Sequence, residues 1–156
     1  MTMKLYRLYT KQFLPINNHQ AWEFFSSPRN LALITPQRLN FQIVSISGDR
    51  DMYEGQTIRY RITVLPFVRI LWETEIKEVI KLRSFTDVQR KGPYSHWTHK
   101  HTFTKVEGGI EMTDELEYAL PLGLVGRLAN FLFISREVKS IFEYRFHVLN
   151  EYFKAT

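Results

Sequence analysis

The sequence predicts an α+β fold in which a curved antiparallel β-sheet wraps around one long C-terminal α-helix. Three observations lead to this prediction. The first is the order of elements: one strand, two short helices, about six strands in series and a final helix. The second is the alternation of apolar and polar residues through the middle of the chain. The third is the apolar surface of the final helix, which is too large to leave in water, so the sheet must curl around it.

The first third of the chain predicts the opening strand and the two short helices. Residues 4–14 are rich in Tyr, Leu and Phe and predict a strand that Pro15 ends. An Asn side chain satisfies early helical amides, so Asn17 and Asn18 predict the start of a short helix over 19–27. Proline favours the first helical position, which predicts a second short helix over 28–35.

The middle of the chain changes to a period of two, which is typical of half-buried strands. Glu107-Gly108-Gly109 is a strong hairpin signal between the last two strands. The predicted strands cover residues 41–46, 56–64, 70–82, 84–90, 97–106 and 110–120.

The last segment, residues 124–153, contains no proline and predicts one helix about 45 Å long. Its apolar residues recur near helical spacing, and we expect them to form one continuous buried face. We likewise expect the apolar stretch that opens this helix to be buried in the core. The residues of the predicted face are Leu124, Leu128, Phe131, Val138, Phe142 and Leu149.

Length and composition narrow the class of protein. A chain of 156 residues fits a single domain over 1–156, and 44% hydrophobic with 24% charged residues is ordinary globular composition. The chain has no cysteine, which excludes a disulfide scaffold, a thiolate zinc site, an iron–sulfur cluster and a cysteine nucleophile.

The same features predict a soluble, cytoplasmic protein that neither inserts stably into a membrane nor binds nucleic acid. The N-terminus lacks a continuous apolar segment of the signal-peptide kind, and the most apolar stretch, residues 119–134, contains Pro121 and Arg127. The net charge of +5 is mild, and the basic residues are mixed with glutamates rather than interleaved with aromatic residues. No coiled-coil seam or edge signature predicts an oligomeric state.

Three segments carry a resemblance to a known family: AWEFFSSPRNLALITP, FTDVQRKGPYSHWTHKHTF and MTDELEYALPLGLVGRLANFLF. With the order of elements, they resemble the polyketide cyclase/dehydrase-like proteins of the START and Bet v 1-like superfamily over essentially the whole chain. The resemblance implies the helix-grip fold, with an internal cavity between sheet and helix for lipids, sterols, polyketides or similar apolar molecules. It also implies that some relatives are cyclases or dehydratases and that many only bind or carry.

The hairpin at Gly108-Gly109 predicts a polar cluster inside the sheet. It sets a register near Phe103–Met112, His101–Asp114 and His99–Leu116, which points both histidines and Asp114 inward. Asp87 and Gln89 are expected to join them from the preceding strand. The candidate ligand-binding residues are Tyr60, Ile62, Trp72, Asp87, Gln89, Trp97, His99, His101, Phe103, Met112, Asp114 and Tyr118.

Three interpretations of this cluster stay open: a polar network that fixes the strand register, a set of groups that recognises a carbonyl or hydroxyl on an apolar ligand, or an acid–base pair. In the acid–base interpretation, His101 is the acid or base and Asp114 orients its ring. No metal is expected, because His96 lies in a turn and points elsewhere and no recognised ligand spacing is present. No cofactor is expected either.

These observations favour a protein that binds a small hydrophobic molecule, such as a lipid, polyketide or quinone, in an internal cavity. An alternative is an enzyme of the cyclase or dehydratase type that uses the His101–Asp114 pair. A third class, a module that binds a partner protein without any small ligand, would be favoured by a large exposed apolar patch.

Overall fold

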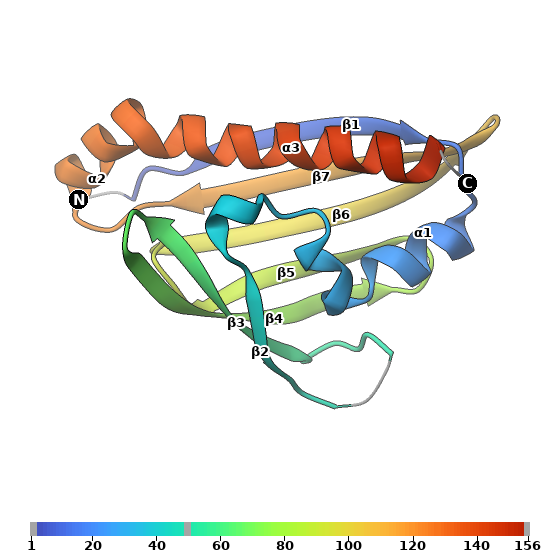
Figure 1. The fold of residues 1–156 in the computed structure, drawn as a ribbon, viewed down its shortest axis with the longest axis horizontal. Coiled ribbons are helices and arrows are strands. Elements are labelled where there is room, and N and C mark those ends of the chain that lie inside the picture. Colours follow the sequence, from blue (N-terminus) through green and yellow to red (C-terminus); the bar gives the residue numbers. More distant parts are fainter. Residues whose placement is uncertain (1–2, 49–50, 155–156) are drawn as a thin grey trace.

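The computed structural model describes residues 3–48 and 51–154, and its strands form one antiparallel sheet in the order β1-β7-β6-β5-β4-β3-β2 (Figure 1). The strands are β1 (Tyr6–Leu14), β2 (Gln42–Ile46), β3 (Thr57–Leu65), β4 (Val68–Ile80), β5 (Ser84–Lys91), β6 (His96–Val106) and β7 (Gly109–Ala119). The helical segments are α1 (Asn18–Phe25), the 3₁₀ turns η1 (Pro28–Ala32) and η2 (Gln37–Leu39), α2 (Gly123–Ala129), the π-helical segment η3 (Asn130–Ile134) and α3 (Ser135–Lys154).

The helices enclose the concave face of the sheet from two sides. The long helix α3 runs along β1, whereas α1 contacts β6 and the 3₁₀ turns contact β2 and β3 (Figure 1). The buried core lies between these layers. The predicted α+β fold, a curved sheet around a C-terminal helix with short helical segments after the first strand, is therefore confirmed.

The start of α1 follows from its capping residues. The backbone amide of Gln20 donates to the Asn17 side chain over 2.9 Å, and the Asn17 amide donates to the Gln20 side chain over 3.0 Å. This reciprocal pair satisfies two amides that the first turn leaves free. The predicted second helix is a shorter 3₁₀ turn that begins at Pro28, and the turn η2 after it was not predicted.

The register of β6 and β7 is the one predicted from the glycine turn. Phe103 pairs with Met112, His101 with Asp114 and His99 with Leu116. Gly108 has a φ of +77°, a conformation that glycine adopts at little cost. A turn of fixed length thus determines which residues of both strands face the interior.

The prediction of one continuous buried face on the last helix is wrong. Helical structure runs from Gly123 to Lys154, but η3 interrupts the α-helical hydrogen bonding. A π-helical turn holds one residue more than an α-helical turn, so the face shifts by about 100° around the axis. Val138, Phe142 and Leu149 are consequently buried, whereas the residues predicted to share their face before η3 are exposed.

The apolar stretch that opens the helix is also not buried, contrary to expectation. Leu124, Val125, Leu128, Phe131 and Phe133 are each more than half exposed, with Phe131 at 77%. The α2 segment contacts the end of the sheet through Gly126, so its larger side chains point away. Among the described residues, no helix is both long enough and apolar enough to cross a bilayer.

Substitution of Gly126 tests how closely α2 packs against the segment that precedes it. A Cβ atom at this position would lie 2.1 Å from the carbonyl oxygen of Pro121, a backbone atom that cannot yield. Gly126→Ala should therefore lower the free energy of unfolding by about 1–2 kcal/mol, although alanine favours helices. Val125→Ala, at the exposed neighbouring position, should change it by less than about 0.5 kcal/mol. Chemical denaturation of both variants checks this expectation, and a stabilised Gly126→Ala protein would contradict it.

Candidate functional site

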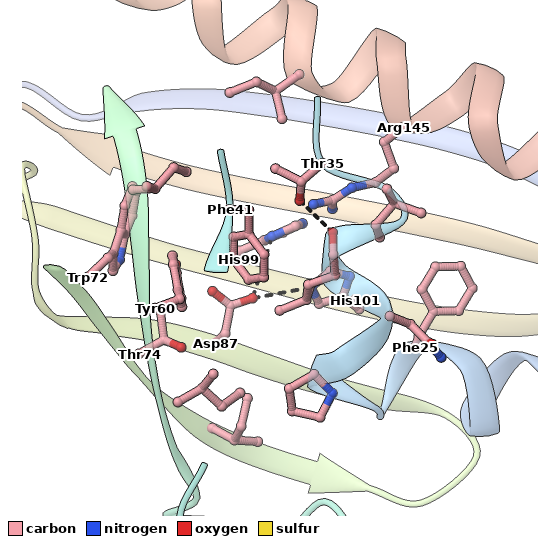
Figure 2. Close-up of a pocket in the computed structure, with 18 of the residues that line it drawn as sticks. Phe25, Thr35, Phe41, Tyr60, Trp72, Thr74, Asp87, His99, His101 and Arg145 are labelled. Carbon is pink, nitrogen blue, oxygen red and sulfur yellow. Dashed lines mark hydrogen bonds and ion pairs between the residues drawn. The ribbon is translucent and has the colours of Figure 1, made fainter. Parts of the chain in front are cut away.

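A cavity of about 150 Å³ lies between the concave face of the sheet, α3 and the short helical segments (Figure 2). Most of its wall is apolar and comes from widely separated parts of the chain, including Phe25 of α1, Ile34 before η2, Ile58 of β3 and Phe142 of α3. Polar groups are concentrated where β5 and β6 meet α3. The cavity is therefore an apolar space with one polar wall.

The polar wall is organised around the buried carboxylate of Asp114 in β7. Its Oδ1 atom accepts a hydrogen bond from His99 Nε2 over 2.8 Å and lies 2.9 Å from His101 Nδ1, although that ring nitrogen lacks a good hydrogen-bond angle. Thr10 in β1 donates to Oδ2 over 3.4 Å, and Arg145 in α3 lies 3.9 Å from Oδ1. One carboxylate thus links β1, β6, β7 and α3.

A second carboxylate, Asp87 in β5, faces the same two imidazoles from the opposite side. Its Oδ2 atom lies 3.2 Å from His101 Nε2, which donates to it, and 3.6 Å from His99 Nδ1. Asp87 and His99 are directly paired across β5 and β6, and His99 and His101 are two residues apart on one face of β6. The two rings, with centroids 3.9 Å apart, are therefore held between two carboxylates, of which Figure 2 shows Asp87.

The cluster carries both signs of charge. Burial alone would raise the pKa of Asp114, but the hydrogen bonds and charges of His101 and His99 hold it well below the ordinary value. The pKa of Asp87 is also lowered, since contacts with the histidines outweigh burial. Burial and the neighbouring His101 lower the pKa of His99. Burial lowers the pKa of His101, but the hydrogen bonds and charges of Asp114 and Asp87 outweigh it and raise this pKa above the ordinary value, so of the two imidazoles His101 takes up a proton more readily.

No protein-family model matches the sequence, and no curated protein sequence matches it. Solved structures, in contrast, match along nearly the whole chain. Protein Ms6760 from Mycobacterium smegmatis is 17% identical, with a TM-score of 0.68 over 99% of this chain and 98% of its own. A norcoclaurine synthase point mutant from Thalictrum, in complex with a transition-state analogue, is 9% identical, with a TM-score of 0.65 over 97% and 98%.

The di-domain ARO/CYC StfQ from the steffimycin biosynthetic pathway is 9% identical, with a TM-score of 0.72 over 97% of this chain and 51% of its own. This chain has the helix-grip fold. The predicted resemblance is thereby confirmed at the level of the fold, which at such low identity is what these likenesses establish.

The helix-grip cavity brings together seven of the predicted site residues. Both histidines are nearly inaccessible to solvent, with 4% exposure for His99 and 6% for His101, and both line the cavity as predicted. Asp114 does not line it, because the two rings stand between its carboxylate and the cavity. The predicted residues that line the cavity are Tyr60, Ile62, Trp72, Asp87, Trp97, His99 and His101.

Four further predicted residues lie away from the cavity wall. Phe103 and Met112 are buried in the core cluster that packs against the C-terminal part of α3. Tyr118 donates from its hydroxyl to Asn130 Oδ1 over 2.9 Å, which fixes it against η3. Gln89 donates through Nε2 to the Tyr94 carbonyl over 2.7 Å, so it supports the turn between β5 and β6. Their assignment to the cavity wall is therefore corrected.

Sequence analysis missed Arg145, which lines the cavity from α3. A signal for it was present, since Arg145 follows Phe142 by three residues and precedes Leu149 by four, which places it near the buried face of the helix. A cation at such a position indicates a paired or functional group. Its partner Asp114 lies far away in the sequence and only the fold brings the two together.

Besides His101 Nδ1, which lies beside Asp114, two nitrogen donors of the cavity residues are buried without a hydrogen-bond partner in the described part of the chain. They are the indole Nε1 of Trp72 and the guanidinium Nε of Arg145. A buried donor without an acceptor costs about 1–3 kcal/mol. A ligand that brings acceptor oxygens into the cavity would remove this cost.

A second hollow of about 280 Å³ adjoins the cavity at the α2 end of the helix-grip sheet. The two spaces share Ile62, Trp72 and Tyr94 as wall residues, and Gly126 and Ala129 line the second one.

Asp114→Asn tests the charge balance of the cluster. The uncharged amide should lower the free energy of unfolding by about 3 kcal/mol at neutral pH, because it removes the buried negative charge around which His99, His101 and the Arg145 cation are arranged. A depressed carboxylate pKa stabilises the fold above the unfolded-state value near 4 and loses that effect as pH falls further. The difference between wild type and variant should therefore shrink below about pH 4.

The matched control is Glu115→Gln, which removes a carboxylate from the exposed face of the same strand. It should change stability by less than about 0.5 kcal/mol at any pH. Urea denaturation between pH 2 and pH 8, about the range over which carboxylates and histidines titrate, measures both differences. A pH-independent effect of Asp114→Asn would contradict the charge assignment.

Proposed function

We propose that this protein binds a small, largely apolar molecule that carries at least one acceptor oxygen, and that it holds this molecule in the cavity between the sheet and α3. The observation that carries the proposal is the pair of buried donors without a hydrogen-bond partner, Trp72 Nε1 and Arg145 Nε, on residues that line a mostly apolar cavity. Ligand sites in proteins combine apolar walls with a few convergent polar groups in this way.

The size of the cavity defines the part of the ligand that it holds. A cavity of about 150 Å³ is large enough for a molecule of the size of benzene. The aromatic rings of Tyr60, Trp72 and Trp97 supply flat surfaces for a ring to pack against. A larger ligand would extend into the adjoining hollow of about 280 Å³, so the proposed ligand is a ring-sized oxygenated group with or without an apolar tail.

Trp72→Phe tests this proposal with a matched pair of probes. Acetophenone carries a carbonyl oxygen, whereas ethylbenzene has a similar shape and no acceptor. The variant keeps an aromatic ring but loses the Nε1 donor, so acetophenone should bind about fivefold more weakly, the equivalent of one hydrogen bond. The affinity for ethylbenzene should change little. Titration followed by protein NMR measures both constants.

Trp22→Phe is the control, because this tryptophan packs edge-on against Phe85 and Phe103 in the core. It should leave the ratio of the two affinities unchanged. Equal loss of both probes in Trp72→Phe would indicate a change of shape rather than a lost donor. Failure of the wild type to bind either probe would overturn the proposal for ring-sized ligands.

A second candidate function is the cyclase or dehydratase type of chemistry predicted as the alternative. The observation that favours it is the position of His101, which lines the cavity, lies between two carboxylates and has a pKa raised by them. A charged imidazole beside a bound carbonyl acts as a general acid, and Asp87, with 20% of its side chain exposed, is the carboxylate nearest the cavity to receive a proton. Asp114 positions the ring from behind, as the sequence predicted for its role.

Proton exchange on a bound ketone tests this second function. In deuterated water, wild-type protein should accelerate exchange of the acetophenone methyl protons, since a general acid on the carbonyl promotes enol formation. His101→Gln should lower the accelerated rate at least 100-fold. His96→Gln, on the outer face of β6 beside Glu117, should have no effect. Proton NMR follows the exchange, and equal rates in wild type and His101→Gln would refute the role of His101.

The cytoplasmic location and the single-domain boundaries expected from the sequence stay predictions.

A further inference from the structure

We propose that Asp87, His99 and His101 form a site for one divalent transition-metal ion, with Zn²⁺ as the reference ion, on the polar wall of the cavity. One potential ligand atom from each of the three residues lies within 4.8 Å of the other two. The inference goes beyond the proposed function, because retention of an apolar molecule needs no ion. It also differs from the expectation from sequence that no metal site is present.

The distances between ligand atoms fit a small metal ion. Zinc bonds to imidazole nitrogen and carboxylate oxygen are about 2.0–2.1 Å long, so tetrahedral ligand atoms lie about 3.3 Å apart. Asp87 Oδ2 lies 3.2 Å from His101 Nε2 and 3.6 Å from His99 Nδ1. These two distances bracket the expected length, and all three ligand atoms lie within 4.8 Å of one another.

Metal-binding histidines need a hydrogen-bond partner on the ring nitrogen that does not bind the metal. Asp114 fills this position for both imidazoles. His99 Nε2 donates to Asp114 Oδ1, and His101 Nδ1 lies 2.9 Å from the same oxygen. A carboxylate behind an imidazole fixes its tautomer and turns the lone pair of the other nitrogen toward the metal. Here the Asp114 carboxylate supports both rings, and the other nitrogen of each ring faces Asp87.

The strand geometry makes this arrangement rigid. His99 and His101 alternate with outward-facing residues on β6, and Asp87 is paired directly with His99 across β5. Ligands on neighbouring strands of one sheet are held more precisely than ligands on loops. The two carboxylates also supply the negative charge that balances a divalent ion.

The chemistry of the donor set defines the class of ion. Two imidazoles and one carboxylate suit Zn²⁺, Fe²⁺, Co²⁺ and similar ions rather than Ca²⁺ or Mg²⁺, which prefer oxygen ligands. Three protein ligands leave a coordination position free, as in catalytic rather than structural zinc sites. All three residues line the cavity, so the free position faces the space in which the ligand binds.

Titration of metal-stripped protein with Zn²⁺ alone tests the site. We expect saturation at one ion per chain in the absence of any organic ligand. Asp87→Asn and His101→Gln remove a ligand and should each weaken binding at least about 100-fold, since loss of an outer-shell carboxylate already costs about 10–100-fold. Asp114→Asn should weaken it by that smaller factor. His96→Gln is the matched control and should bind like wild type, because its ring faces Glu117 outside the cavity.

A measurement on wild-type protein keeps the test independent of variants that fail to fold. In nitrogen-15 NMR of the histidine rings, Zn²⁺ should shift His99 Nδ1 and His101 Nε2 and leave the signals of His19 and His147 unchanged. Absence of saturable Zn²⁺ binding would overturn the proposal. So would a response confined to His96, which would indicate an adventitious surface site with Glu117.

The outcome is separable from that of the proposed function. The Zn²⁺ titration contains no acetophenone, and the acetophenone titration is carried out in excess chelator. A negative result in one titration leaves the conclusion from the other titration unaffected.

Discussion

The structure depends on one interaction, the buried carboxylate of Asp114 shared between His99 and His101. A carboxylate at 2% exposure costs several kcal/mol unless charges and hydrogen bonds replace its water. The partners that replace it come from three elements: both histidines from β6, Thr10 from β1 and Arg145 from α3. The same contacts that stabilise the carboxylate therefore fix where the long helix lies on the sheet and which way the two rings face.

The position of the cavity follows from where α3 is hydrogen-bonded to the sheet and where it is not. Near its C-terminal half, α3 is fastened to β1, because Gln12 Nε2 donates to the Phe146 carbonyl over 2.8 Å and to Asn150 Oδ1 over 3.1 Å. Toward β3 and β4 the sheet curves away from α3 (Figure 1). The large rings of Trp72 and Tyr60 stack on one another in this region, with centroids 5.8 Å apart. A single helix cannot fill a sheet that bends away from it, so space remains.

The part of this arrangement that sequence could predict is the part set by local geometry. The Gly108-Gly109 turn fixes the pairing of His101 with Asp114, and alternation then points both histidines inward. Gln89 shares the phase of Asp87 and yet turns back to the Tyr94 backbone, because a nearby turn competes for its amide. The spacing of the apolar residues gives no sign of the π-helical turn that begins at Asn130, so the shift of the buried face around the helix could not be predicted. Arg145 had the right phase, but its partner is 31 residues away and only tertiary packing identifies it.

The two imidazole nitrogens that face Asp87 are shared by the proton transfer and the metal site proposed above. Asp114 occupies the far side of both rings, which leaves His99 Nδ1 and His101 Nε2 directed toward the cavity side of the cluster. A proton on His101 would supply an acid beside a bound oxygen, whereas a metal ion held by the same lone pairs would supply a Lewis acid instead. Proton and metal exclude each other, because each lone pair forms one bond. In both cases the acceptor oxygen of a ligand would meet a positive centre at the same place. Asp114 would therefore determine which kind of ligand group fits there, because it orients both rings, and the reaction would depend on whether the two nitrogens carry a proton or a metal ion.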